Sequence, residues 1–542
     1  MTTRVAGHAG EQAVAALRGF GVDVMFTLNG GHVWPLYEAA EHQGVRIVDT
    51  RHEQTATFAA EAWAKLTRRP GLAVLTAGPG VTNGISAITT AHFNGSPLVV
   101  LGGRAPARRW GAGSLQELDH VPIVASVTKT AGTATSGESI VAAVDAACRA
   151  ARTPHRGPTF VDIPLDAFGP ADVELPPTGD AASFRGDAPD PDAVNRIAEL
   201  VSDATQPVVI AGGDVYWANA ERALRAFADA ARVPVIVNGM GRGTIPADHE
   251  LAFARARSLA LKEADLVVVA GTPLDFRLGF GRFGDARVVH VCDAASEVAP
   301  HATLAASSAG DLAATFAALA DAGATPGVHD AWIERLRAEE LAQREAERPM
   351  LEARSAPIKP ARVYGELRKR LDRDAIVIGD GGDFVSYAGK LIDSFAPGTF
   401  LDPGPYGCLG MGPGYALGAA IAHPDRQIVL LLGDGAIGFA LGDFERLVHH
   451  AVNITAIVGN NGIWGLEKHP MRALFGYDVV ADLGPRIRYD EVIVAFGGHG
   501  ELVTEPADLG PALDRAFATP GVSLVNVITD PADAYPRSSN LG

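Results

Sequence analysis

Short apolar runs, each closed by small residues, most constrain the fold of this chain. The runs are LAVLTAG, PLVVLGG, QPVVIAGG, DLVVVAG, AIVIGDGG, QIVLLLGDG and ITAIVGNN, and a helical pattern follows each of them. Apolar runs of this length that alternate with helices are typical of buried parallel strands in βαβ units. The sequence therefore predicts an α/β fold, and its ligands are expected beyond the carboxyl ends of the strands, where glycines and acids gather.

Two weaker segments divide the chain into three units. Residues 168–192 read FGPADVELPPTGDAASFRGDAPDPD, in which Pro, Gly and Asp remove both helical and strand periodicity. From Trp332 a charged helical pattern leads into a connector that ends near Pro360. We therefore expect three open, doubly wound parallel-sheet α/β domains, over residues 1–170, 190–330 and 358–542.

Charge and cysteine content exclude several classes of partner. The net charge of −17 argues against nucleic acid and anionic membranes, which such a surface repels at long range. Cys148, Cys292 and Cys408 lack the spacing of a disulfide framework or a zinc site and fit a reducing cytoplasm. The N-terminus reads as an amphipathic helix rather than a signal peptide, and no apolar run approaches the roughly 20 residues that span a bilayer.

The strongest functional motif joins two of the predicted strand ends. GDG at 433–435 is followed, after 24 residues, by the Asn pair 460–461, and each motif closes an apolar run. Asp434, the Asn461 amide and the backbone carbonyl of Ile463 are hard oxygen ligands, as Mg²⁺ prefers, and diphosphate oxygens and water would complete the shell. A lone GDG is often only a turn, but this spacing between two strands favours the metal site.

These motifs resemble those of the thiamine-diphosphate enzymes, whose members include acetolactate synthase, oxalyl-CoA decarboxylase and 2-hydroxyacyl-CoA lyase. The similarity runs through the whole chain, and it is closest to 2-hydroxyacyl-CoA lyases of the actinobacterial type and acetolactate synthase-like proteins. It implies an N-terminal domain for the aminopyrimidine ring, a nucleotide-binding-like central domain and a C-terminal domain for the diphosphate. The implied cofactors are thiamine diphosphate and Mg²⁺.

The resemblance also assigns a catalytic glutamate to the first domain. Glu53, in IVDTRHEQTATFAAEAWAK, stands after a predicted strand and at a helix start. In the family such a carboxyl group hydrogen-bonds the aminopyrimidine and helps to activate the cofactor. Taken alone, Glu53 would be an acid that faces a helix dipole.

Further residues match segments that surround the cofactor in the family. His32 is expected to orient a substrate carbonyl or hydroxyl, although a structural loop histidine is almost as well supported. Leu409 matches the apolar wedge between the two cofactor rings, and Asp383 matches the loop at the diphosphate, where it is equally explained as a turn former. The implied cofactor-binding set is Gly30, Gly31, Thr76, Asn83, Asp383, Leu409, Gly433, Gly435 and Ala436.

Three features favour an acyl-CoA substrate. The central run ARSLALKEAD and the arginine-rich loop after it resemble the segment that serves the CoA nucleotide, so Arg255 or Arg257 is expected to bind phosphate with help from Arg277. The alternative is a surface salt bridge. GSLQELDH carries Leu115 and Gln116 where oxalyl-CoA decarboxylases carry Tyr and Glu. This substitution removes a polar pair and puts an apolar residue over the reaction centre, which argues against an oxalyl-CoA decarboxylase. The Gln/Trp stretch of acetolactate synthases after the Asn pair is absent.

Glu467 stands at that position instead, beside Leu466. A lyase needs one group to remove the 2-hydroxyl proton and to return a proton later, and a carboxylate can do both. We expect Leu115 and Leu466 to wall the site around Glu467, with His32 and Gln116 as further catalytic residues. The alternative is a surface acid paired with Lys468 or Arg472.

The sequence thus predicts a 2-hydroxyacyl-CoA lyase that reversibly forms formyl-CoA and an aldehyde or ketone. The alternatives are an acetolactate synthase-type carboligase acting on pyruvate and an oxalyl-CoA decarboxylase. The resemblance implies a homodimer or homotetramer with active sites at the subunit interface. Arg537, in the C-terminal YPRSSNLG, is expected to contact the CoA substrate.

Overall fold

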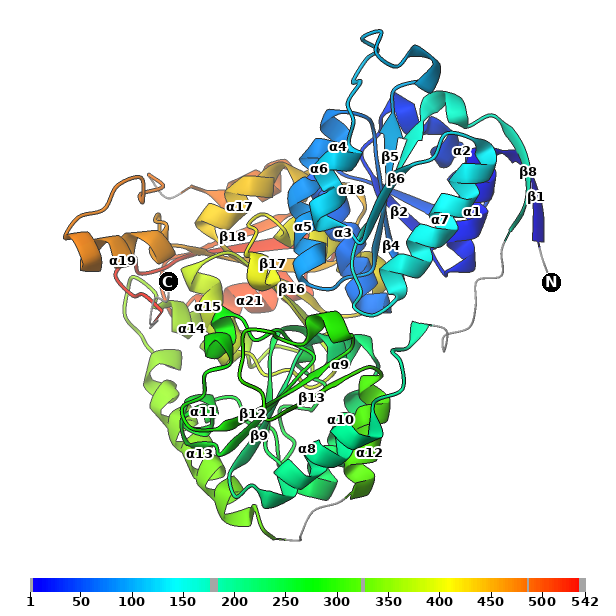
Figure 1. The fold of residues 1–542 in the computed structure, drawn as a ribbon. Helices are drawn as coiled ribbons and strands as arrows, with labels where there is room; N and C mark the ends of the chain where they lie inside the picture. The colour runs from blue at the N-terminus through cyan, green and yellow to red at the C-terminus, as the bar shows by residue number, and fades with distance from the viewer. Residues whose placement is uncertain (1–2, 176–183, 323–326, 485–486, 536–542) are drawn as a thin grey trace.

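The computed structural model describes residues 3–175, 184–322, 327–484 and 487–535, and Figure 1 shows three α/β bodies packed together. All of the apolar runs that predicted strands are strands. The sheets have the orders β3-β2-β4-β5-β7-β6, β10-β9-β11-β12-β13 and β15-β14-β16-β17-β19-β18. Neighbouring strands within each of them are parallel. The predicted fold class is therefore confirmed.

The first body is the blue and cyan part of Figure 1. Residues alternate between the two faces of its sheet: Ala73 and Leu75 enter the core beneath α3, whereas Leu72 and Val74 enter the core beneath α1 and α7. Its elements are β1 (Thr3–His8), α1 (Ala9–Gly19), β2 (Val24–Thr27), α2 (Trp34–His42), β3 (Arg46–Asp49), α3 (Glu53–Thr67), β4 (Gly71–Leu75), α4 (Pro79–Asn83), α5 (Ile85–Phe93), β5 (Leu98–Arg104), α6 (Val121–Val124), β6 (Thr130–Thr133), α7 (Gly137–Arg152), β7 (Thr159–Pro164) and β8 (Pro170–Leu175).

The two ends of this body differ from the expectation. Residues 3–8 form β1 rather than the start of a helix, and they pair antiparallel with β8, which lies in the segment predicted to be a linker. This pairing joins residues more than 160 positions apart, such as Thr3 and Leu175. Because strand pairing of this range depends on the tertiary fold, neither local periodicity nor composition indicates it.

The central body, green in Figure 1, surrounds a separate core. The expected charged helix after Trp332 is present as α13, and it runs along this body toward the third one. The elements are α8 (Pro191–Asp203), β9 (Pro207–Ala211), α9 (Gly213–Trp217), α10 (Glu221–Ala231), β10 (Val235–Val237), α11 (Arg257–Glu263), β11 (Leu266–Ala270), β12 (Arg287–Cys292), β13 (Ala306–Ala309), α12 (Leu312–Ala322) and α13 (Asp330–Leu351).

The third body shares one apolar core with the first, because α16 packs against α3. The two helices approach so closely that a Cβ on Gly418 would lie 2.2 Å from the Ala59 carbonyl oxygen, so only glycine fits there. The elements are α14 (Pro360–Leu367), β14 (Ile376–Asp380), α15 (Asp383–Leu391), β15 (Phe400–Leu401), α16 (Gly412–Ala422), β16 (Ile428–Gly433), α17 (Asp434–Ala440), α18 (Phe444–His449), β17 (Ile454–Asn460), α19 (Gly465–Phe475), α20 (Tyr489–Ala495), β18 (His499–Val503), α21 (Leu509–Ala518) and β19 (Val522–Ile528).

None of the described helices combines the length and the apolar composition that crossing a bilayer requires.

Candidate active site

The GDG and Asn motifs lie side by side at the carboxyl edge of the third sheet. β16 and β17 are neighbours, with Gly433 opposite Gly459, so Asp434 and the Asn pair follow at the same level. The Gly462 backbone N–H donates to Asp434 Oδ2 at 2.6 Å, and the Ile463 N–H donates to Asn461 Oδ1 at 3.1 Å. The loop after β17 is thus folded around the two oxygen-bearing side chains.

A cavity opens at this edge, and it collects the predicted diphosphate and metal residues. Around it stand a carboxylate, an amide and the backbone at the start of α17, which together suit a cation and its bound diphosphate. The indole of Trp464 closes one side so tightly that a Cβ on Gly435 would lie 2.3 Å from its ring. The predicted residues that line the cavity are Asp383, Leu409, Gly433, Asp434, Gly435, Ala436, Asn461, Ile463, Leu466 and Glu467.

Glu53 lies in the first body, as the first residue of α3, and its side chain is buried. Asn83 Nδ2, at the end of α4, donates to Glu53 Oε2 at 2.9 Å. Two of the first-domain residues that the resemblance assigns to the cofactor, Glu53 and Asn83, are therefore in direct contact. None of the described first-domain residues lines the third-domain cavity, so in one chain the two sets form separate half-sites.

His32 and Thr76 lie together at the ends of β2 and β4. His32 Nδ1 is 3.2 Å from Thr76 Oγ1, and burial lowers the pKa of His32, so its imidazole is neutral at pH 7. A Cβ on Gly30 would lie 2.2 Å from the Thr76 Cβ, which explains the glycine. Gly31 begins the short turn that carries His32.

Leu115 and Gln116 border the same half-site. The Leu115 backbone hydrogen-bonds His32, and the Leu115 side chain is 77% exposed. Gln116 adopts a positive φ of 58° and packs against Gly78. The Leu115 side chain is therefore exposed at the rim of the first-domain half-site. In one chain, Leu115 is not among the residues that line the third-domain cavity with Leu466.

Glu467 lies in the first turn of α19 at the cavity, and it is exposed. Its expected surface partners are occupied elsewhere: Lys468 pairs with Asp478 and Asp482, and Arg472 pairs with Asp478. Among the described residues, the Glu467 carboxylate makes neither an ion pair nor a side-chain hydrogen bond. The surface-pair alternative is therefore absent from the described residues, and in one chain Leu466 lines the cavity with Glu467 whereas Leu115 does not.

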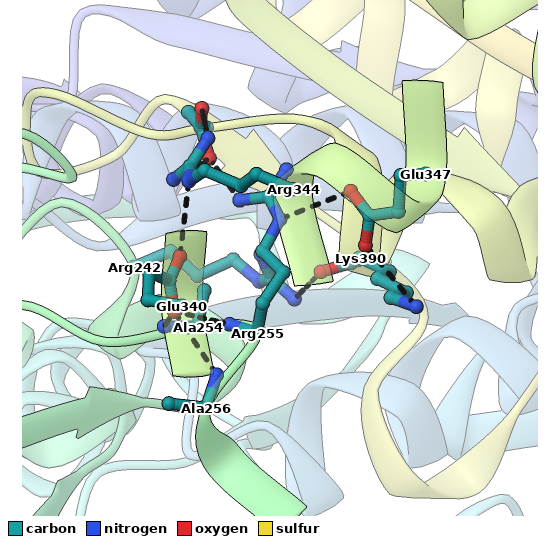
Figure 2. Close-up of polar contacts among 10 residues, drawn as sticks. Arg242, Ala254, Arg255, Ala256, Glu340, Arg344, Glu347 and Lys390 are labelled. Atoms are coloured by element: carbon teal, nitrogen blue, oxygen red, sulfur yellow. Dashed lines mark hydrogen bonds and ion pairs between the residues drawn. The ribbon is translucent and has the colours of Figure 1, made fainter. Parts of the chain in front are cut away.

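Arg255 departs from its expected role in phosphate binding. Its guanidinium is buried, 2.5 Å from Asp393 and 3.4 Å from Glu347, which also contacts Lys390. Its backbone N–H and those of the two flanking alanines donate to one oxygen of Glu340 on α13, as Figure 2 shows. Arg255 thus follows the salt-bridge alternative, but in the interior, where it pairs with Glu347 on α13 and with Asp393 in the segment that follows α15.

Arg257, two residues later, has a different environment. It is half-buried, and within the described ranges no carboxylate pairs with it. Burial and the nearby Arg242 and Arg277 lower the pKa of Arg257 to about 10, so it remains a cation at pH 7. Arg277 is held by Asp275 in a two-pronged ion pair, in which Nη2 donates to Oδ2 at 2.7 Å and Nε donates to Oδ1 at 3.1 Å. Arg537 lies outside the described residues.

The sequence interpretation missed two features of these half-sites. Trp464 packs on Gly435, and no local sequence pattern predicts this contact. His120, the last residue of GSLQELDH, is fully buried and hydrogen-bonds both Gly78 and Asp162. The sequence signal that could have identified His120 is its place in the same short segment as the predicted site residue Gln116, four residues later.

The chain has three parallel-sheet domains, with an acid–amide pair at the carboxyl edge of the third sheet and a buried glutamate in the first domain. This arrangement is typical of a class of cofactor-dependent enzymes. Comparison with known proteins identifies the cofactor. The descriptions "Thiamine pyrophosphate enzyme, N-terminal TPP binding domain", "central domain" and "C-terminal TPP binding domain" match residues 8–123, 194–319 and 380–527. The chain therefore belongs to the thiamine-diphosphate-dependent enzymes.

Similar curated proteins carry two different activities in their names. A "Probable acetolactate synthase" of Mycobacterium bovis is 53% identical over 98% of both chains. A "2-hydroxyacyl-CoA lyase 2" of Caenorhabditis elegans is 32% identical over 97% of this chain and 90% of that protein, and one of Homo sapiens is 33% identical over 92% and 85%. These matches support a carbon–carbon lyase or carboligase.

Proposed function

We propose that this protein is a magnesium-dependent 2-hydroxyacyl-CoA lyase, which reversibly cleaves a 2-hydroxyacyl-CoA to formyl-CoA and an aldehyde or ketone. The observation that carries the proposal is the Glu467 carboxylate, which lies at the cofactor cavity without an ion-pair partner among the described residues. A proton-transfer group with no competing cation is what the cleavage of a 2-hydroxyacyl thioester requires.

Asp434, Asn461 and the carbonyl of Ile463 would hold Mg²⁺, and the start of α17 would receive the diphosphate. When bound, thiamine diphosphate supplies a nucleophilic carbon for the substrate carbonyl and accepts the electron pair of the broken carbon–carbon bond. Glu467 would take the 2-hydroxyl proton and later return a proton to the carbon that leaves as formyl-CoA. Neutral His32 would orient a substrate oxygen by hydrogen bonding.

The acyl-CoA part of the proposal rests on Arg257. A half-buried guanidinium beside two other arginines, with no carboxylate paired to it in the described ranges, suits an anionic group such as a CoA phosphate. The charge of Arg242 acts on Arg257 and on Tyr535, and the Tyr535 N–H donates to Asp383 at the cavity at 2.9 Å. The proposal places an extended substrate along this series of residues, with its phosphate end at Arg257.

Arg255 and Arg257 form a matched pair for a test. Arg257→Ala is expected to raise the KM for formyl-CoA by about 10- to 100-fold, since a charge-assisted phosphate contact is lost, and to leave kcat and stability unchanged. Arg255→Ala is expected to lower the free energy of unfolding by roughly 1–3 kcal/mol, because Glu347 and Asp393 each lose a hydrogen-bonded cation and keep only Lys390 and Arg344. Steady-state kinetics and urea unfolding of both variants measure this. Equal KM values in Arg257→Ala and the parent would remove the CoA assignment from Arg257.

A carboligase acting on pyruvate is the second candidate, because the relatives at 53% identity carry the name acetolactate synthase. Purified protein with thiamine diphosphate and Mg²⁺ separates the candidates when it is offered pyruvate, formyl-CoA with an aldehyde, and oxalyl-CoA in parallel. The proposal expects a 2-hydroxyacyl-CoA product in the second reaction. Acetolactate from pyruvate, with no product from formyl-CoA, would establish the carboligase instead.

The active unit is proposed to be a homodimer or larger oligomer, because the Glu53 half-site and the Asp434 half-site are separate in one chain. The inactive variants Glu53→Gln and Asp434→Ala should then complement each other. After subunit exchange, about half of the dimers are mixed and contain one intact site of two, so about a quarter of the parental activity is expected. A mixture as inactive as its components would place both half-sites in one chain.

A further inference from the structure

The 114–120 segment, which carries Leu115 and Gln116, is attached to the first body through its last residue. His120 is fully buried, and its Nε2 accepts the Gly78 backbone N–H at 2.9 Å. On the other side of the ring, Nδ1 lies 3.0 Å from Asp162 Oδ1. Because a backbone N–H can only donate, Nε2 carries no proton, and the single ring proton lies on Nδ1, from which it is donated to Asp162.

Asp162 is fixed in turn by Arg104 at the end of β5. Arg104 Nη1 is 2.6 Å from Asp162 Oδ2 and 2.9 Å from Asp119 Oδ1, and its guanidinium stacks 3.8 Å from the Trp110 ring centroid. Arg104 therefore holds the segment at Asp119 directly and at His120 through Asp162. Hydrogen bonds at both ring nitrogens therefore fix the orientation of the His120 imidazole.

The other partner of His120 belongs to the loop that holds the cofactor-side residues. Gly78 has a φ of 63°, and a Cβ there would lie 2.9 Å from the Gln116 Cβ, so the loop and the segment are in close contact. Thr76 contacts His32 before this point, and Asn83 contacts Glu53 after it. The Gly78–His120 hydrogen bond thus joins the segment with Leu115 to the loop that orients His32 and Glu53.

We propose that His120 is a positioning residue that fixes Leu115 over the first-domain half-site and thereby sets the size of the aldehyde or ketone that the enzyme accepts. The inference rests on the proposed lyase function for its substrate. An exposed leucine restricts a substrate only if its backbone cannot retreat, and the hydrogen bonds of His120 provide this restraint. Asp162 and Arg104 act through His120.

Two variants separate the hydrogen bonds of His120. In His120→Gln the side-chain oxygen can still accept the Gly78 N–H, whereas in His120→Asn the amide can still donate to Asp162 but does not reach Gly78. The measurement is the ratio of kcat/KM for condensation of formyl-CoA with acetaldehyde and with a branched ketone. Since one methylene changes discrimination by about 10- to 200-fold in a rigid apolar pocket, His120→Asn should lower this ratio by about tenfold and His120→Gln should preserve it.

Hydrogen exchange of the peptide that covers residues 76–84 gives a readout that needs no turnover. It should be faster in His120→Asn and parental in His120→Gln. If the parent makes no product from formyl-CoA, the lyase proposal fails, and this exchange still decides whether His120 restrains the loop. A merely structural histidine predicts equal losses of thermal stability in both variants, with an unchanged ratio and equal exchange, and that result would overturn the inference.

Discussion

Glu53→Gln is expected to reduce turnover by roughly 10²- to 10⁴-fold, the usual contribution of a positioned proton-transfer group. Glutamine preserves the shape of the side chain and its carbonyl oxygen, so it can still accept the hydrogen bond from Asn83. What it loses is a carboxyl group that can share a proton with the aminopyrimidine ring. Loss of activity without loss of the fold is therefore the expected result.

Asp434→Ala is the matched control at the other half-site. Asp434 accepts the Gly462 N–H and is a proposed metal ligand, so its removal should weaken the retention of thiamine diphosphate and Mg²⁺. Titration calorimetry of both variants, together with steady-state rates, separates the two effects. Glu53→Gln should bind the cofactor nearly as the parent does. Parental turnover in Glu53→Gln would contradict the catalytic assignment.

The parts of the site that follow from strand order were predictable from the sequence. The GDG and Asn motifs each close an apolar run, and parallel strands end at the same edge of a sheet, so local pattern was enough to place Asp434 beside Asn461. Glu53 was identified only through the family resemblance. Its contact with Asn83 depends on how the loop after β4 folds back, which no local pattern determines.

The arginines show why the rest could not be predicted. Arg255 and Arg257 are two residues apart in one motif, and both have the chemistry of a phosphate ligand. Their environments differ because the three N–H groups at 254–256 bind Glu340 on α13, about 85 positions later, and this turns Arg255 toward buried acids. A contact of such range is a property of the tertiary fold. His120 was missed for the same reason, since its partners lie 42 positions away on either side.

Glu467→Gln is expected to slow both cleavage and condensation by roughly 10- to 1000-fold, with cofactor binding intact, if the proposed lyase function holds. The carboxylate lies at the cavity beside Leu466, and the cations nearest to it in sequence are bound to Asp478 and Asp482. It is therefore available to exchange protons with a substrate in either direction. Glutamine keeps the size and polarity of the side chain but can neither accept nor return a proton.

Glu467 is exposed in one chain, so the size of the rate loss also reports whether a second subunit covers the cavity in the active oligomer. If a second subunit places Leu115 over the cavity, as the separate half-sites suggest, the loss should be large, because water has little access to replace the carboxylate. If the cavity stays open in the active oligomer, water substitutes in part and the loss should lie near tenfold. Glu505→Gln, which changes an exposed glutamate outside the cavity, is the matched control and should leave the rate unchanged. Steady-state rates of both variants in both directions give the answer, and a Glu467→Gln enzyme that condenses formyl-CoA with an aldehyde at the parental rate would remove the chief mechanistic support for the lyase.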